Sequence, residues 1–141
     1  MIKDLVHSIG VQRAFKTAQV TGDTNSTDVI DTQGYENVTF IFNIDTVAAA
    51  DGTNTLTIKV QESDDSTFAT GVVEVTAADP SRTLGTQLVI NSTTMADKIK
   101  KFGVALGAKR YMRLVLDETG TIDVTLGAIA VLGGPRHAPV S

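Results

Sequence analysis

Apolar and polar residues alternate along several short segments of the chain. In residues 37–44 every second residue is apolar, and the same two-residue period recurs in 54–61 and 121–132. Because successive side chains of a strand point to opposite faces, each segment has one face for a core and one for water. The alternating apolar residues are Val38, Phe40, Phe42, Ile44, Leu56, Ile58, Val60, Ile122, Val124 and Leu126.

Shorter segments with the same character separate runs of turn-forming residues. The pattern predicts seven or eight short strands, which is typical of an all-β fold, either a β-sandwich or a jelly-roll-like barrel. No proline interrupts a predicted strand, as this interpretation requires. The additional strand candidates are residues 28–32, 71–76, 86–90 and 110–117, while 91–101 fits either a helix or a loop that leads into a strand.

The last predicted strand differs from the others because it stays apolar on both faces. Residues 128–132 contain no polar side chain. This composition predicts a strand in the middle of a sheet, or one that a partner chain covers. No linker or internal repeat divides the sequence, so we expect one domain over residues 1–141, with a sandwich at 16–132 between an N-terminal arm (1–15) and a C-terminal tail (133–141).

The two ends of the chain are candidate contact segments. Apolar residues near the start follow a helical spacing, so the arm is expected to be a short helix or an extended segment. The tail contains two prolines, which favour an extended conformation. The ends therefore predict an assembly interface formed by Ile2, Leu5, Val6, Ile9, Pro135, Arg136 and His137.

Candidate catalytic chemistry is sparse. The chain has no cysteine and two histidines, His7 and His137, both in terminal segments where a neighbouring nucleophile or carboxylate is hard to hold in place. The acid pairs at 64–65 and 117–118 are adjacent in sequence, so their side chains diverge and form no acid–base dyad. We therefore expect no enzyme activity, no cofactor and no small-molecule substrate.

The acidic loops raise the question of a calcium site. Oxygen ligands are available in residues 62–65, and in Asp45, Asp51 and Asn54. Neither group has the spacing of a calcium-binding loop, and Asp and Asn are the favoured residues of tight turns. The sequence therefore predicts structural turns and no metal site.

Charge is unevenly distributed along the chain. The net charge is −4, with only acidic charges between Lys16 and Lys59 and only basic charges from Lys98 to Arg113. Two interpretations stay open: two solvated faces of opposite sign, or an acidic face of one copy against a basic face of another. The second adds Lys109, Arg110 and Arg113 to the predicted interface. Too few aromatic residues accompany the basic stretch to predict nucleic-acid binding.

Other partners and compartments are constrained by what the sequence lacks. No apolar run is long enough to cross a bilayer, and the first residues do not form a secretory signal. The absence of cysteine is compatible with folding in a reducing cytoplasm. We expect no membrane partner.

Four sequence blocks, in order, resemble small virion proteins of tailed bacteriophages. The opening block has KDL at 3–5 and continues from Asp31 to the Gly-Tyr-Glu of 34–36. The others are LTIKVQESDDSTF at 56–68, GAKRYMRLV at 107–115 and LGGPRHAP at 132–139. The segment 86–101 departs from the pattern as an insert with three lysines.

The resemblance implies a structural particle component, made in the cytoplasm of a bacterial host and located on the virion. A head decoration (cement) protein on the capsid shell is the favoured role, with the major capsid protein and other copies of the chain as partners. Because closed symmetry suits a lattice site, a homotrimer is expected.

Two alternatives remain. A tail, head–tail completion or head-fibre protein would share the same composition. A carbohydrate- or cell-surface-binding β-sandwich module is disfavoured, because sugar sites use exposed aromatic platforms and this chain has no tryptophan and only two tyrosines, Tyr35 and Tyr111.

Overall fold

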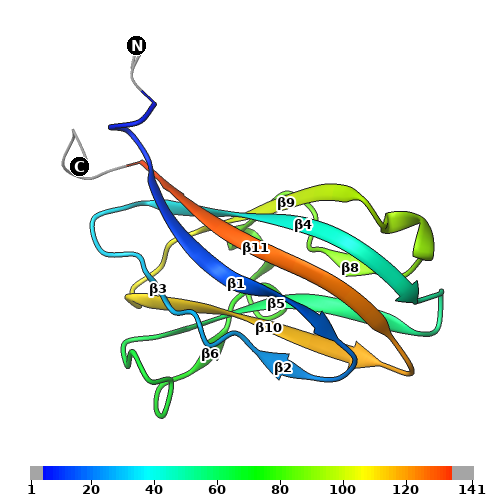
Figure 1. Ribbon diagram of the computed structural model, residues 1–141. Helices are drawn as coiled ribbons and strands as arrows, with labels where there is room; N and C mark the ends of the chain where they lie inside the picture. The colour runs from blue at the N-terminus through cyan, green and yellow to red at the C-terminus, as the bar shows by residue number, and fades with distance from the viewer. Residues whose placement is uncertain (1–4, 135–141) are drawn as a thin grey trace.

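The computed structural model describes residues 5–134 as two antiparallel sheets packed face to face (Figure 1). Sheet A has the strand order β1-β11-β4-β9-β7. Sheet B has the order β2-β10-β5-β6, with β3 also paired to β10 and β8 to β5. The described elements are β1 (Gly10–Val20), β2 (Thr24–Asn25), β3 (Ile30–Asp31), β4 (Asn37–Ala49), β5 (Thr55–Ser63), β6 (Val73–Glu74), β7 (Thr83–Leu84), β8 (Val89–Ile90), β9 (Lys98–Ala105), β10 (Tyr111–Thr119), β11 (Asp123–Gly133) and the 3-10 turns η1 (Pro80–Arg82) and η2 (Thr93–Met95).

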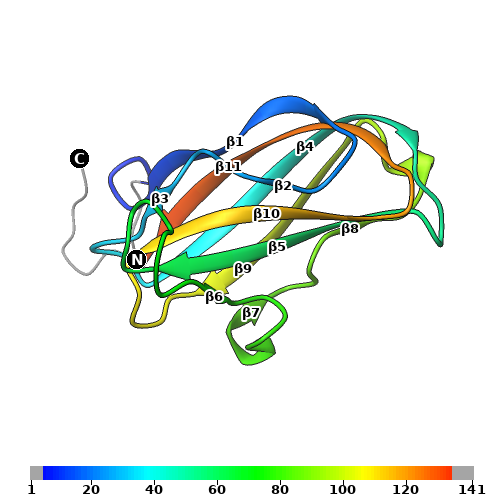
Figure 2. The same cartoon turned by 90° about the horizontal axis from the view of Figure 1, so that it is seen from below.

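The all-β sandwich predicted from alternation is confirmed, and the two sheets do not close into a barrel. Figure 2, seen from the side of sheet B, shows β10 and β5 lying across β4 and β11. The described chain has eleven strands, more than the seven or eight expected, because five of them contain only two residues. Six longer strands supply the body of the fold.

The core lies between the sheets, where the apolar face of each long strand is buried. On β4 the residues Val38, Phe40, Phe42 and Ile44 are fully buried, and the intervening positions face outward. Phe102 of β9 packs on both phenylalanines of β4, with ring centroids 5.8 and 5.5 Å apart. Sheet B contributes its inward-facing residues Leu56, Ile58, Val60, Met112, Leu114 and Leu116.

β11 is a central strand of sheet A, as its apolar composition predicted. It pairs with β1 on one side and with β4 on the other. Ala128, Ala130 and Leu132 point into the core, whereas Ile129 on the outer face is 43% exposed. The two-sided apolar pattern thus marks the middle position of this strand within its sheet.

The N-terminal boundary differs from the expected one. β1 begins at Gly10, inside the segment 1–15 that was expected to be an arm, and Ala14 is fully buried. Its register against β11 shifts twice, between Arg13 and Phe15 and between Phe15 and Ala18. These bulges interrupt the alternation of apolar residues, so the sequence pattern gave no strand signal there.

The ambiguous segment 91–101 also resolves into a definite structure. It forms the short turn η2 and then enters β9, so the loop-into-strand interpretation is correct. The strands expected at 71–76 and 86–90 shrink to two paired residues each. Within residues 5–134 there is no helix long and apolar enough to cross a membrane.

Candidate assembly surface

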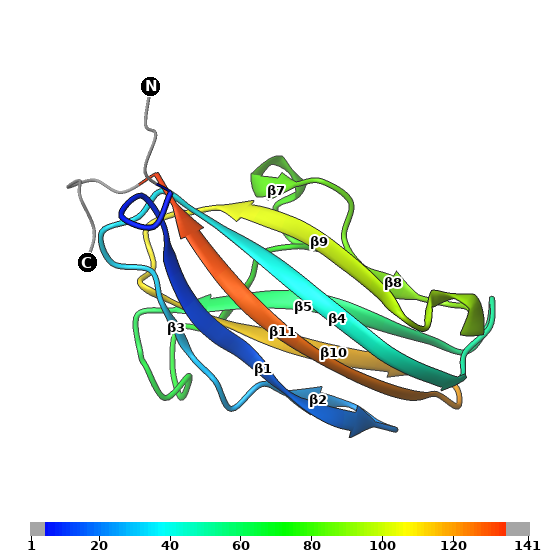
Figure 3. The ribbon, with the colours of Figure 1, turned by 45° about the horizontal axis from the view of Figure 1, so that its top comes forward.

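One end of the sandwich gathers the start of β1, the end of β11 and the loops that precede β4 and β10. We call it the terminal end, and it lies at the left of Figure 3. Gly10 pairs with Leu132, so the first and last long strands meet there. The backbone of Glu36 links three of these segments, because its N–H donates to the Gly133 carbonyl (3.1 Å) and its carbonyl accepts from the Leu106 N–H (2.9 Å).

Described residues from each of the four blocks that carry the sequence resemblance lie at this end. Leu5 precedes β1, and the segment 31–36 leads into β4. The turn after β5 reaches the same place, because Asp64 accepts a hydrogen bond from the backbone N–H of Arg110 at 3.1 Å. Gly133 closes β11 beside Asn37. Segments far apart in sequence therefore form one continuous surface.

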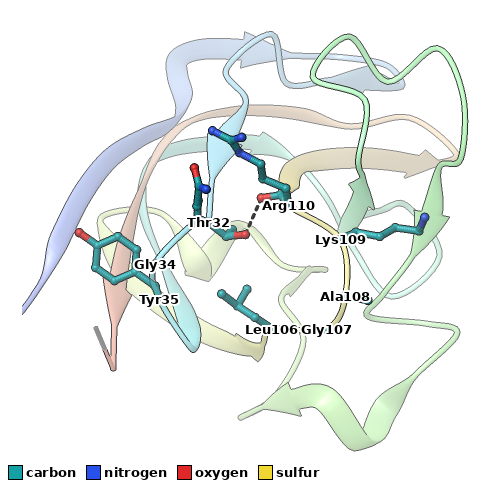
Figure 4. A pocket seen from close by; sticks show the side chains of 9 residues that line it. Thr32, Gly34, Tyr35, Leu106, Gly107, Ala108, Lys109 and Arg110 are labelled. Atoms are coloured by element: carbon teal, nitrogen blue, oxygen red, sulfur yellow. Dashed lines mark hydrogen bonds between the residues drawn. The ribbon is translucent and has the colours of Figure 1, made fainter. Parts of the chain in front are cut away.

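A small hollow of about 230 Å³ opens in this surface between the loop before β4 and the loop before β10 (Figure 4). The hydroxyl and the backbone N–H of Thr32 both donate to the Arg110 carbonyl, at 2.5 and 3.0 Å, and close one side of it. The lining contains no carboxylate or imidazole side chain. Its lining residues are Thr32, Gln33, Gly34, Tyr35, Leu106, Gly107, Ala108, Lys109 and Arg110.

Arg110, one of the predicted interface residues, is held by an acid of its own chain. Its Nε and Nη2 atoms donate to the two carboxylate oxygens of Asp31 at 3.0 and 2.8 Å. The hydrogen bonds from Arg110 hold the pKa of the Asp31 carboxyl below its ordinary value. The acidic front of the sequence and its basic stretch therefore meet within one copy at this pair.

The other two predicted basic residues lie nearby in different surroundings. Lys109 places its Nζ 3.9 Å from the Asp64 carboxylate. Arg113 lies on the outer face of sheet B, where its guanidinium donates to Gln61 Oε1 at 3.0 and 2.9 Å. The same group lies 4.5 Å from the ring centre of Phe68. Arg113 is thus part of the side of the sandwich rather than of the hollow.

The predicted apolar contact residues are placed only in part. Leu5 and Val6 are 67% and 76% exposed, whereas Ile9 is half-buried. Residues 5–8 form a turn closed by a hydrogen bond from the Ser8 N–H to the Leu5 carbonyl, so no helix forms in this stretch. Ile2, Pro135, Arg136 and His137 lie outside the described residues.

The acidic loops that raised the question of calcium are occupied by their own hydrogen bonds. Asp51 accepts from the backbone N–H groups of Thr53 and Asn54, both at 2.8 Å. Asp65 accepts from the N–H of Thr67 at 2.9 Å and from Ala69 at 3.1 Å. These contacts confirm the predicted turn role for Asp51 and Asp65, whereas Asp45 and Glu62 lie in β4 and β5. Between residues 5 and 134 no three His, Cys, Asp or Glu side chains lie where they could hold a metal ion together.

The sequence indicated that acidic and basic residues are segregated along the chain, but not which acid pairs with which base. The Asp31–Arg110 pair joins residues 79 positions apart, and the only signal for it was the segregation of acids from bases along the chain. In comparisons with known proteins, no family model matches the chain and no curated protein matches it.

Proposed function

We propose that this chain is a structural virion protein of a tailed phage, and that it decorates the outside of the capsid shell and stabilises contacts between neighbouring capsomers. The observation that supports this role is that described residues from each of the four resembling blocks lie at the terminal end. A shared binding surface gives a reason for similar sequence in segments that are distant along the chain. The enclosed core alone would not require similarity in surface loops.

The exposed apolar residues at the same end give the surface a binding chemistry. Leu5 and Val6 project from a turn outside the sheets and bury little of their side chains. Each large aliphatic side chain gains roughly 1.5–3 kcal/mol when it is fully buried. On a shell, a groove between capsomers would supply the missing cover.

The rest of the surface fits a protein that works through repeated contacts. A rigid sandwich keeps the loops of the terminal end in a fixed geometry, so little ordering is lost on binding. Many copies on one lattice, each with a modest interface, give strong overall attachment through avidity. The proposed partners are the major capsid protein and further copies of this chain, in a homotrimer at a threefold position. No catalysis is part of the proposed role.

The direct experiment adds the purified protein to expanded, undecorated heads and images them by electron cryo-microscopy. We expect extra density at one class of symmetry-related surface sites, with the terminal end of the sandwich against the shell. Failure to bind heads, or recovery of the protein with tails alone, would overturn the decoration role. Binding through the opposite end would keep the role and remove the proposed surface.

A further inference from the structure

The outer edge of β9 is an open sheet edge. On one side, β9 pairs with β4 over its whole length from Lys98 to Ala105. On the other side, only Gly103 and Val104 of β9 are paired, with β7. Within the described chain, no strand pairs with this edge from Lys98 to Lys101, since β8, which Figure 3 draws beside it, pairs with β5 instead. An edge of this kind presents unpaired backbone groups to solvent.

The register identifies which backbone groups point outward. The Leu106 N–H donates to the Glu36 carbonyl, and the same register continues without a shift from Ala105 to Lys98. Since successive residues of a strand present their backbone groups to opposite neighbours, the even-numbered residues face β4. The N–H and carbonyl groups of Ile99 and Lys101 therefore point away from the sheet.

The side chains along this edge are cationic on both faces. Lys98 and Lys100 lie opposite Ile44 and Phe42 and so share the core side of sheet A, whereas Lys101 lies opposite Ile41 on the outer side. All three lysines are exposed. None of them forms an ion pair with another residue in the described range 5–134.

An apolar contact lies among these charges. Ile99 is 66% exposed and points to the outer face of sheet A, next to Asn43. It borders a hollow of about 550 Å³ that runs across the strands to Ile129, with Ile41 and Gly127 also in its lining. One aliphatic side chain of a neighbouring strand would lie against Ile99 at the mouth of this hollow.

We propose that the β9 edge binds an extended acidic segment of a partner protein as an added strand of sheet A. The segment pairs its backbone with Ile99 and Lys101, places acidic side chains opposite the three lysines, and places one aliphatic side chain opposite Ile99. Charge complementarity selects the partner, since both faces of the edge are positive. The inference applies to any partner protein and does not require the proposed virion role.

Two other occupants fit the edge less well. A second copy paired edge to edge would bring lysines together, and like charges on adjacent strands are destabilising. A nucleic acid would satisfy the lysines but would leave the outward backbone groups of Ile99 and Lys101 without a regular partner ladder. An acidic strand satisfies both the charges and the backbone.

The test uses the full chain labelled with ¹⁵N and a capped peptide of sequence Thr-Thr-Glu-Glu-Val-Glu-Thr-Thr. We expect amide chemical-shift changes confined to β9 and its neighbours, slower exchange of the Ile99 and Lys101 amide protons, and a dissociation constant on the order of 1 mM or tighter. The same peptide with lysine in place of glutamate should not bind. No shift change with the acidic peptide, or changes confined to another strand, would overturn the proposal.

Two variants separate charge from backbone pairing. Reversal of the edge charges in K98E/K100E/K101E should weaken peptide binding by about tenfold, whereas K109E, in the loop before β10 and outside the lining of the hollow beside Ile99, should leave it unchanged. Ile99→Pro removes an outward N–H at an edge position that tolerates proline, and should abolish the protection of Lys101. Equal binding by wild type and the charge-reversed protein, or binding of single-stranded DNA without any amide protection, would contradict the proposed strand addition. The charge variant stands as a test by itself if the proline variant does not fold.

Discussion

Arg82 and Glu62 form a bidentate ion pair at the terminal end of the sandwich. The Nη1 and Nη2 atoms of Arg82 donate to the two carboxylate oxygens of Glu62 at 2.8 and 2.9 Å, and its Nε donates to the Ala105 carbonyl at 2.9 Å. Glu62 belongs to sheet B and Ala105 to sheet A. The side chain of Arg82 is 19% exposed and that of Glu62 is 6% exposed. This largely buried arginine therefore links the two sheets.

Removal of Arg82 should destabilise the fold strongly. Arg82→Ala leaves the Glu62 carboxylate buried without a partner, and we expect the free energy of unfolding to fall by about 3 kcal/mol. Urea denaturation at neutral pH measures this change. Arg13→Ala is the matched control, because Arg13 forms a similar pair with Asp28 but is 61% exposed, and its loss should be much smaller. Equal losses of unfolding free energy in the two variants would contradict the prediction that the buried Glu62 carboxylate makes the loss of Arg82 more costly.

Gly107 should accept no side chain while Arg82 is in place. A Cβ at this position would lie 2.8 Å from Cζ of Arg82, whose guanidinium is fixed by Glu62 and Ala105. Gly107→Ala should therefore cost roughly 1–3 kcal/mol of stability through overpacking. In the Arg82→Ala background the same substitution should cost less, because the obstructing group is gone. A double-mutant cycle by urea denaturation measures the coupling, and strictly additive losses would contradict the contact.

Leu5 and Val6 should matter for binding and not for folding. The double substitution Leu5→Ser and Val6→Ser removes exposed apolar surface, so the free energy of unfolding should change by no more than about 0.5 kcal/mol. Attachment to undecorated heads should drop clearly in a sedimentation assay, since the proposed contact loses its apolar part. Val89→Ser is a suitable control, because Val89 is also exposed but lies in β8, which pairs with Leu56 and Thr57 at the other end of β5. Unchanged attachment of the Leu5/Val6 variant would remove these residues from the proposed interface.

Acid should weaken the fold through the carboxylates that accept hydrogen bonds in turns. Bonds from the backbone N–H of Thr53 and from Asn54 lower the pKa of Asp51 well below its ordinary value. A carboxyl with a lowered pKa stabilises the folded state above its unfolded-state pKa, and this contribution is lost as the pH falls through the folded-state value. Stability should therefore decline progressively below about pH 4.

Asp51→Asn isolates one part of this acid response. Asparagine can still accept the two backbone bonds that reach Oδ1, but it does not titrate, so the variant should lose less stability than the wild type between neutral pH and the acid range. Urea midpoints at several pH values provide the comparison. Parallel pH profiles for the two proteins would contradict a role for Asp51 in the acid sensitivity.

The strands with a buried and a solvent face were predictable from local pattern. In β4 as far as Ile44, and in β5 as far as Glu62, buried side chains alternate with more exposed ones, because both strands lie in sheet interiors and bury one face each. β1 escaped prediction, since its register shifts twice and residues 16–19 are all exposed between the buried Ala14 and Val20. β9 was ambiguous for a different reason: an edge strand can carry lysines on both faces, so its first half has no alternating burial.

The candidate surface was predictable in its residues but not in its geometry. Lys109 and Arg110 stood out as charges in a resembling block, yet which acid each one meets depends on how the loops before β4 and β10 are brought together. The Arg82–Glu62 pair had no signal at all, because the two residues belong to different loops and strands. Long-range pairing of this kind follows from sheet topology, which alternation does not encode.

The central place of β11 has a consequence for the order in which the protein can fold during synthesis. β1 and β4 are not neighbours in sheet A, and each pairs with β11 between them. While the ribosome is still translating the middle of the chain, neither strand has its main partner, so their apolar faces have no completed sheet to join. β4 can pair earlier with β9, but β1 pairs in sheet A with β11 alone, so the sheet is completed only after residues 123–133 have left the ribosome.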